Sequence, residues 1–408
     1  MWSDFPTFKA ALVAVAIFVL PAPAFAATPD DTARAEIAAL LDGMRFKRSG
    51  QYEKAITAFR AALALAPNSL TLRQELAHTL YLDKQYRAAS RAFANLQKLD
   101  PNGAASAKYA EFRAAIEREK PVGVSGYFTL TPSSNVNDGS GQTIFDTVLG
   151  PFVITQASQA RSGIGIAAGI AGYFRKNIGE NRRLTLTWGL DGMVYPTAHV
   201  LDQISFRSGL SLSGKSGVFN WNVTPNIQWT MRANQTPERR IGVRFNAQRL
   251  LSNQHVLRFE ASQSYLSSPS QPHRTGPQGA ISLHYAHQVS PDLTLSLGAK
   301  LAYARPRVQH LGFNEYTATL GATKTWDQSL HLGAEIFFGA RRYLADFPLA
   351  ARPQQDQFYG LTLSLQNDHL SYQGFTPRLS CSYRRNRSNI ALSDSTKTEC
   401  GLSITKTF

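Results

Sequence analysis

Beyond its first 26 residues, this chain lacks any apolar run long enough to cross a membrane as a helix. A spanning helix needs roughly 18 or more apolar residues in succession. The mean hydropathy is correspondingly low, at −0.22. Because the bilayer core offers no hydrogen-bond partners to the backbone, the only other spanning structure is a closed β-barrel. The low hydropathy therefore excludes a spanning helix but does not exclude residence in a membrane.

The sequence also lacks the side-chain arrangements that enzymes and metal sites need. No His, Asp and Ser set or Cys and His set has the pattern of a nucleophilic site, and no metal-ligand spacing occurs. The run from Gly163 to Gly169 resembles a phosphate loop only superficially, because no strand-to-helix context surrounds it. No nucleic-acid-binding motif is present. We therefore expect no enzyme activity, no cofactor and no nucleic-acid partner.

Acidic residues are scarce relative to basic ones, with 28 Asp and Glu against 43 Lys and Arg, for a net charge of +15. Residues 122–408 carry 27 bases and 16 acids, so this region alone contributes +11. Such a surface can attract anionic cargo or border anionic lipopolysaccharide. The simpler interpretation is that these side chains only solvate a lumen and loops.

Residues 1–26 have the layout of a secretory signal peptide. Lys9 precedes an apolar run over residues 10–20, and Ala24-Phe25-Ala26 is a small-x-small cleavage site. We expect the mature protein to begin at Ala27. Since no cysteine follows the cleavage site, we expect the protein itself not to be lipidated.

Residues 27–121 contain a helical repeat with a period of 34. The matched pairs are Tyr52 and Tyr86, Ala55 and Ala89, Phe59 and Phe93, Leu65 and Leu99, and Pro67 and Pro101, preceded in the same frame by Gly43 and Ala77, then Phe46 and Leu80. This period is that of the tetratricopeptide repeat, in which small residues lie where helices approach and proline ends the second helix. A third helix, Ala104–Lys120, is expected to cap the stack. Such stacks bind peptides or proteins on a concave face, although this one can alternatively brace or plug a barrel.

After Pro121 the apolar period changes from 3.6 to 2, which predicts strands. The alternating runs are Val122–Thr131, Ser162–Phe174, Arg183–Tyr195, Ile204–Gly214, Phe219–Met231, Ile241–Leu250, Val256–Leu266, Ala280–Val289, Leu293–Ala304, Glu315–Trp326, Leu330–Tyr343, Phe358–Leu365, Thr376–Tyr383 and Lys397–Phe408. Fourteen is an even number, as in bacterial outer-membrane barrels, and a last strand ending on an aromatic such as Phe408 is typical of them. The predicted fold is α+β: tetratricopeptide repeats, then a 14-stranded antiparallel transmembrane β-barrel over residues 122–408.

The connections between these runs predict the orientation. The expected outer loops are long and include Ser133–Arg161, Pro196–Gln203, Ser267–Gly279, Arg305–Asn314 and Arg341–Gln357; the inner turns, such as Gly214–Val218, Ser290–Asp292 and Asp327–Ser329, are short. Aromatic girdles are expected from Trp188, Tyr195, Trp221, Trp229, Tyr265, Tyr303, Trp326 and Tyr343. Pro225 lies inside an expected strand, where it requires a bulge or a weak pairing.

The only two cysteines, Cys381 and Cys400, share the parity of the apolar faces of the last two expected strands. A hairpin that turns near Asn389–Leu392 places them opposite each other. Because an exported protein meets oxidising conditions, we expect a cross-strand disulfide near the outer rim. The alternative is two lipid-facing thiols that act as small apolar groups.

The segment Thr129–Asn137, TLTPSSNVN, joins the first expected strand to its loop. With the signal peptide, the repeats and the barrel, it resembles the surface lipoprotein assembly modifiers (Slam), the outer-membrane proteins of the type XI secretion system. Pro132, Ser134, Asn135 and Asn137 are similar to the Pro-x-Ser-Asn-x-Asn stretch that opens the barrel domain of that family. Two Asn at positions i and i+2 of a strand can ladder through their side-chain amides. The alternative is a plain polar turn.

The resemblance implies a translocon that moves specific client proteins from the periplasm to the cell surface. The clients implied are surface lipoproteins or small secreted haem- or metal-acquisition proteins, and nothing in the sequence selects between them. The implied partners are the client, a periplasmic chaperone that delivers it, and the barrel assembly machinery during insertion. The implied location is the outer membrane of a Gram-negative bacterium, beside lipopolysaccharide, with the repeat domain in the periplasm.

Two other functions fit a barrel of this kind. An exopolysaccharide exporter also joins tetratricopeptide repeats to a barrel, but such exporters carry many more repeats. A nutrient channel or porin needs only the barrel, and an added repeat domain has no evident use in it.

Overall fold

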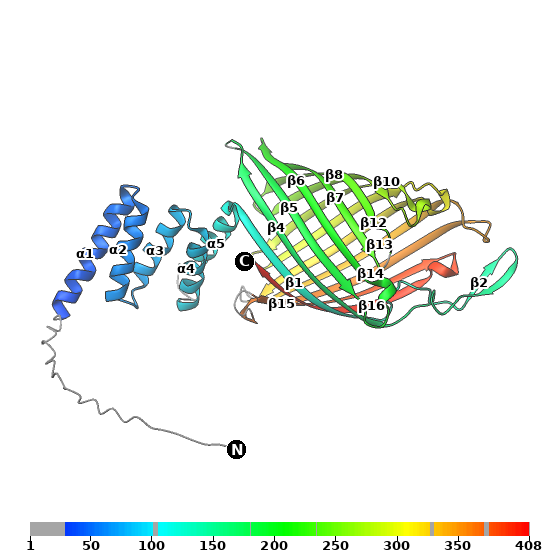
Figure 1. Ribbon diagram of the computed structural model, residues 1–408, viewed down its shortest axis with the longest axis horizontal. Coiled ribbons are helices and arrows are strands. Elements are labelled where there is room, and N and C mark those ends of the chain that lie inside the picture. Colours follow the sequence, from blue (N-terminus) through cyan, green and yellow to red (C-terminus); the bar gives the residue numbers. More distant parts are fainter. Residues whose placement is uncertain are drawn as a thin grey trace, which may run out of the picture. The chain divides into compact units, whose positions relative to one another are not determined.

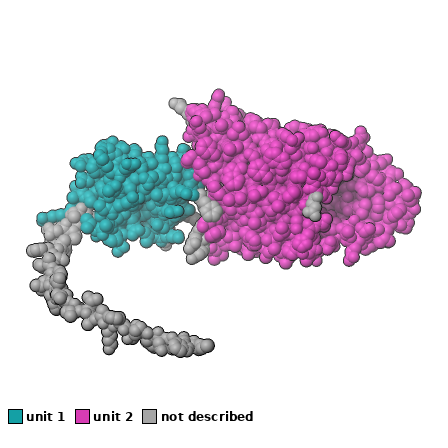
Figure 2. Space-filling view, in the orientation of Figure 1, with its two compact units in different colours: residues 1–120 teal, residues 121–408 magenta. Residues whose placement is uncertain are grey.

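A computed structural model describes residues 29–100, 105–179, 181–233, 235–326, 330–370 and 375–407. The predicted signal peptide, Ala27, Pro101, the turn Asp327–Ser329 and Phe408 lie outside these ranges. The chain divides after Lys120 into two compact units, coloured teal and magenta in Figure 2. Among the described helices, none is long and apolar enough to cross a membrane.

The first unit consists of helices that pack each on the next along the chain (Figure 1). They are α1 (Pro29–Arg48), α2 (Tyr52–Leu65), α3 (Leu70–Leu82), α4 (Tyr86–Leu99) and α5 (Ser106–Glu119). Most of the apolar repeat positions form the core, since the exposed fraction is 3% or less for Ala55, Phe59, Ala77, Leu80, Ala89 and Phe93. Tyr52, Tyr86 and Phe46 are half-buried, and Pro67 is exposed just after α2 ends.

Gly43 shows why the repeat needs a small residue at this position. A Cβ atom there would lie 2.5 Å from Cε1 of Phe59, so any side chain would push α1 away from α2. Ala77 occupies the same position in the next repeat and is fully buried. The helical packing therefore follows from the 34-residue pattern.

The second unit is a closed antiparallel barrel of fourteen strands within the described residues (Figure 1). The strands are β1 (Val122–Ser133), β4 (Gly163–Asn177), β5 (Arg182–Val194), β6 (Gln203–Ser216), β7 (Phe219–Arg232), β8 (Glu238–Ser252), β9 (His255–Ser267), β10 (Gly276–Ser290), β11 (Leu293–Ala304), β12 (Phe313–Trp326), β13 (Leu330–Asp346), β14 (Pro353–Asn367), β15 (Phe375–Ser388) and β16 (Ser395–Thr407). Each strand pairs with its neighbour in sequence, and β1 closes the barrel on β16. The predicted fold class is confirmed.

The outer face of the barrel is apolar, as contact with lipid requires. On β4, Ile164, Ile170 and Phe174 are each more than 40% exposed, while the alternate positions, such as Gly165 and Ala167, face the interior. Apolar residues on neighbouring strands lie side by side, for example Ile170 opposite Leu190. Because the closed barrel has no free edge, all its ladders are internal, and the protein resides in the outer membrane.

The two ends of the barrel differ in the length of their connections. Turns of two residues, at 217–218, 253–254 and 291–292, lie at the end where the first strand begins. The opposite end carries the connection 134–162, which contains a small hairpin of β2 (Ile144–Thr147) and β3 (Gly150–Val153). Short turns face the periplasm in such barrels. The repeat unit, which directly precedes β1, is therefore periplasmic.

Short 3-10 helices occur in several connections. They are η1 (His199–Leu201), η2 (Pro272–Arg274), η3 (Gln309–Leu311) and η5 (Ala391–Ser393) at the outer end, and η4 (Asp368–Leu370) at the inner end.

The strands reach further outward than the apolar alternation predicts. The expected outer loop Arg341–Gln357 is mostly strand, because β13 continues to Asp346 and β14 begins at Pro353. Likewise β15 continues to Ser388. Backbone ladders do not require apolar side chains, so they persist above the lipid where both faces meet water. The hairpin β2–β3 was not predicted either.

Pro225 interrupts one ladder without shifting it. The pairing of β6 with β7 runs from Gly209–Asn226 to Leu212–Val223 in the same register, and the positions between them are unpaired. On the other side Pro225 pairs with Val243. Of the two predicted possibilities, the structure shows the weak pairing and not a bulge.

Two of the expected girdle aromatics do not face lipid. Tyr343 follows the lumen-facing parity of Arg341, whose Nη1 lies 3.5 Å from the Tyr343 hydroxyl. Tyr195 follows the parity of Asp191 and contacts the inward position Gly165. Because parity along a strand decides the face, an aromatic residue alone does not predict a lipid-facing girdle.

Candidate functional site: the closing seam and the outer loop

The seam between β1 and β16 is interrupted at one level. Its ladder pairs Leu130 with Leu402 and resumes with Ser133 opposite Glu399, leaving Thr131 and Pro132 unpaired with β16. The Ser134 amide donates to Thr398 O (2.9 Å), so backbone amides two residues earlier on β1 point the same way. Pro132 has no N–H to donate there. The seam is therefore weakened where Pro132 faces the position of Cys400.

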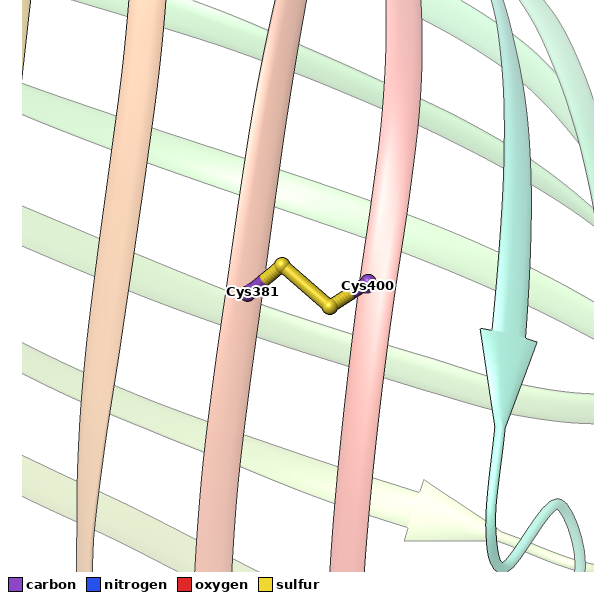
Figure 3. The surroundings of a disulfide bond; sticks show 2 residues. All are labelled: Cys381 and Cys400. Atoms are coloured by element: carbon purple, nitrogen blue, oxygen red, sulfur yellow. A yellow bond between two sulfur atoms is a disulfide. The ribbon is translucent and has the colours of Figure 1, made fainter.

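At this same level β16 is covalently joined to its other neighbour. Cys381 on β15 and Cys400 on β16 are directly paired, with 4.0 Å between their Cα atoms, and their sulfur atoms form a disulfide (Figure 3). The bond lies near the middle of β15, not at the outer rim as expected, because β15 extends to Ser388. β16 is thus fixed to β15 where its ladder to β1 is broken.

Asn135 ties the first outer loop to the end of β16. Its side chain is fully buried, and its Nδ2 donates to Gly139 O (2.9 Å) and Thr396 O (3.2 Å). Its Oδ1 accepts from the Gly139 amide at 2.9 Å. A side chain at Gly139 would collide with the carbonyl of Gln159, so glycine is required at this close approach.

Asn137 joins the start of the same loop to its end. Its Nδ2 donates to Ala157 O (3.1 Å) and Gln159 O (2.8 Å), and its Oδ1 accepts from the Arg161 amide (3.0 Å). The predicted ladder between the two Asn amides is therefore wrong. Both residues lie beyond the end of β1, and each binds backbone groups that a loop leaves without partners. Ser134 adds a side-chain acceptor for the Thr398 amide at 2.9 Å.

The first outer loop also rests on the connection between β15 and β16. Ser140 Oγ donates to Ala391 O (2.5 Å), and the Gly141 amide donates to Asp394 O (2.8 Å). Phe145, which lies on β2, packs with two other buried apolar side chains, Ile154 and Ile390. The loop is docked by both polar and apolar contacts.

Asp394 is the charged residue that joins the first outer loop to the connection between β15 and β16. Arg385 donates to both of its carboxylate oxygens, at 2.7 and 2.9 Å, and Gln142 donates at 3.3 Å. Burial alone would raise the pKa of Asp394, but the hydrogen bonds from Arg385 and Gln142 outweigh it and lower the pKa below its usual value. Sequence reasoning missed this pair, since the two residues are nine apart across a turn that had no motif.

In the repeat unit, polar contacts join helices that begin successive repeats. Lys47 on α1 donates to Glu75 (2.6 Å) and contacts His78 Nδ1 (2.9 Å), both on α3. Gln74 on α3 donates to the hydroxyl of Tyr109 on α5. Burial, with the charge of Lys47, lowers the pKa of His78. These contacts link α1 to α3 and α3 to α5.

Comparison with known proteins identifies both units. Residues 123–408 match the family model of the surface lipoprotein assembly modifier, and residues 47–116 match a tetratricopeptide repeat. No curated protein matches the chain.

Several solved structures of distant sequence are similar to this chain. They include the CymD monoaromatic hydrocarbon channel (TM-score 0.40, 10% identity, 75% of this chain and 93% of that one). An anion-selective porin from Comamonas acidovorans (0.37, 10%, 70% and 99%) and a bacterial polysaccharide outer membrane secretin (0.38, 8%, 70% and 98%) are others. With TM-scores below 0.5, none of them bears on what this chain does.

The family model covers the barrel from its second residue onward, including the segment from Pro132 to Asn137 that organises the seam and the outer loop. The chain therefore belongs to the surface lipoprotein assembly modifier family, and its role is a non-enzymatic one in lipoprotein assembly or translocation at the outer membrane.

Proposed function

We propose that this protein is a translocon that carries specific client lipoproteins from the periplasm to the cell surface. The family match over residues 123–408 is the observation that carries the proposal, because it covers the membrane-spanning unit and not only an accessory domain. The name of the family favours lipoproteins over soluble haem- or metal-acquisition proteins, which are the alternative clients. A periplasmic chaperone would deliver the client, and the barrel assembly machinery would insert the barrel.

We assign capture of the client to the repeat unit. Helix α1 presents two exposed apolar side chains on one face, Ile37 (56% exposed) and Leu41 (63%), which are four residues apart. Exposed apolar groups of this kind contribute to protein contacts when they lie together. An incompletely folded client offers matching apolar segments.

We assign release of the client to the seam between β1 and β16. Separation of these strands is eased at Pro132, because the ladder is already interrupted there. The disulfide to Cys381 keeps β16 on β15 while β1 moves. Folding of the client outside would supply direction.

The test compares cells that lack the protein, cells with the full chain, and cells with a chain deleted for residues 30–120. Surface lipoproteins are quantified by protease shaving, and their total amounts by whole-cell proteomics. In cells that lack the protein, we expect one or a few lipoproteins to be missing from the surface while their total amounts are retained. In cells with the deleted chain, the same lipoproteins should remain absent from the surface. Unchanged display in all three strains would contradict the proposal and favour simple permeation, as in a nutrient channel.

A further inference from the structure

A cavity of about 660 Å³ lies inside the barrel. Its lining side chains come from the outer-end halves of their strands, for example Arg240 near the start of β8 and Arg341 near the end of β13. Five of the lining residues are cationic and one is acidic. The cations are Arg240, Arg244, Lys300, Arg341 and Arg384, and the acid is Glu315.

The single carboxylate already forms hydrogen bonds with two of the cations. Arg341 donates to Glu315 Oε2 through Nε (3.0 Å) and Nη2 (2.6 Å), and Lys300 donates to Oε1 (3.3 Å). The Glu315 side chain is only 10% exposed. One negative charge therefore serves two cations.

Of the other three cations, Arg240 and Arg384 have no ion-pair partner within the described part of the chain. Arg240 Nε is buried and has no hydrogen-bond partner there. Arg244 forms an ion pair with Glu260, with 3.7 Å between its Nε and the carboxylate. Arg384 lies over the ring of Phe358, 5.1 Å from its centroid. The cavity thus holds a surplus of positive charge.

Aromatic rings lie against two of the cations, Arg341 and Arg384. The guanidinium of Arg341 lies 4.6 Å from the centroid of Phe313, and Phe358 is flanked by Arg341 and Arg384. The aromatic rings form a low-dielectric wall, which focuses the electric field of the charges into the cavity. The planar guanidinium groups match the two oxygens of a carboxylate.

We propose that this cavity is a binding site for carboxylates. Arg240 and Arg384 hold the carboxylate, beside the ion pair of Glu315 with Arg341. The carboxylate can belong to an Asp or Glu side chain of a polypeptide inside the lumen or to a small organic acid. The site goes beyond the proposed function, because it concerns equilibrium binding to the barrel and does not depend on client display.

The experiment uses the purified full chain in detergent and isothermal titration calorimetry with three probes. Hexaglutamate represents a polypeptide, succinate represents a small acid, and hexalysine reverses the charge. We expect saturable binding of hexaglutamate, succinate or both, which weakens as salt is added, and no binding of hexalysine. Binding of hexaglutamate alone assigns the site to polypeptides, and binding of succinate assigns it to small acids as well.

Two variants and one control locate the site. Arg240→Gln and Arg384→Gln should each weaken binding about tenfold, since a lost charge-assisted hydrogen bond costs about 1.5 kcal/mol. Arg258→Gln is the control, because Arg258 faces the lumen opposite Gln248 but does not line the cavity. It should bind as the unaltered protein does. Heat-dependent migration in gels shows that each barrel is folded.

Three results would overturn the proposal. They are an absence of carboxylate binding to the folded barrel, equal binding of hexalysine, and equal weakening by Arg258→Gln. Client display in cells is measured separately, so loss of the carboxylate site and failure of translocation are distinguishable.

Discussion

At the scale of single residues, the described part of the repeat unit contains one non-glycine residue with a left-handed backbone, Lys84. Gly50 and Lys84 are 34 residues apart, and both adopt left-handed backbone conformations, with φ of 74° and 60°. Glycine adopts this conformation without a steric penalty, whereas lysine does not. The second repeat therefore carries a strain that the first avoids.

We predict that Lys84→Gly stabilises the repeat unit by about 1 kcal/mol. The measurement is thermal unfolding of the helical circular dichroism signal of the full chain. The matched control is Gly50→Lys, which introduces the same strain and should lower the transition. Movement of both variants in the same direction would contradict this interpretation.

A second residue-scale prediction concerns Asp394. Because its pKa is lowered in the folded protein from the ordinary 3.8, the docking that it supports is fully present above that value. Docking should be lost as the pH falls through the lowered pKa. Protection of the amides of Ser140 and Gly141 from hydrogen exchange, with the measured rates corrected for the intrinsic effect of pH, should fall in that window.

The control for this prediction is Asp394→Asn, which removes the titrating group and keeps the shape of the side chain. This variant should show low protection of the same amides at neutral pH and little further loss in acid. A pH-dependent loss of equal size in the variant would assign the effect to another group.

At the scale of elements, the disulfide should stabilise the pair β15–β16. It links residues 19 apart, and closing a loop of that length contributes about 3 kcal/mol through the entropy of the unfolded chain. We predict that Cys381→Ser with Cys400→Ser lowers the temperature at which the barrel loses its compact gel migration. Alkylation of two free thiols in the unreduced mature protein would contradict the bond itself.

The seam makes a separate prediction. Thr129 Oγ1 donates to Ser403 Oγ at 3.1 Å across β1 and β16, so a cysteine pair at these positions should crosslink. In a background without the native cysteines, oxidation of this pair should abolish client display, and reduction should restore it. The control pair, Ser364→Cys and Ser380→Cys, crosslinks β14 to β15 at directly opposed positions. Full display with a closed seam would contradict the exit route.

The elements were largely predictable from the sequence, and the reason is physical. Lipid selects apolar side chains at alternate positions, so every membrane-spanning strand carries a period of two. Above the lipid this selection ends, and the outer parts of β14 and β15 were missed for that reason. The pairing of Cys381 with Cys400 follows from parity and a short hairpin, whereas their height in the barrel depends on the missed strand ends.

The outer loop was less predictable than the strands. Asn135 and Asn137 stood out in the sequence, but their partners Thr396 and Gln159 lie far along the chain. Side-chain bonds to distant backbone groups leave no local periodicity. The charge surplus of the barrel was visible in the composition, but its concentration at one height of the lumen required the register.

At the scale of the whole molecule, the chain combines a periplasmic repeat stack with a closed barrel. The barrel alone spans the membrane, and in the family to which the chain belongs this unit defines the role in lipoprotein assembly. Our central claim is that the two units together move a lipoprotein across the outer membrane without a chemical energy source.

The most direct test of this claim is reconstitution of the purified full chain in liposomes. A lipoprotein identified by the surface comparison is supplied, incompletely folded, on the side of the repeat unit, and its protection from protease added on the other side is measured. The account predicts that the lipoprotein becomes cleavable only in vesicles that contain the full chain, and not in vesicles whose seam is crosslinked. Continued protection of the lipoprotein in vesicles that contain the full chain with an uncrosslinked seam would contradict it.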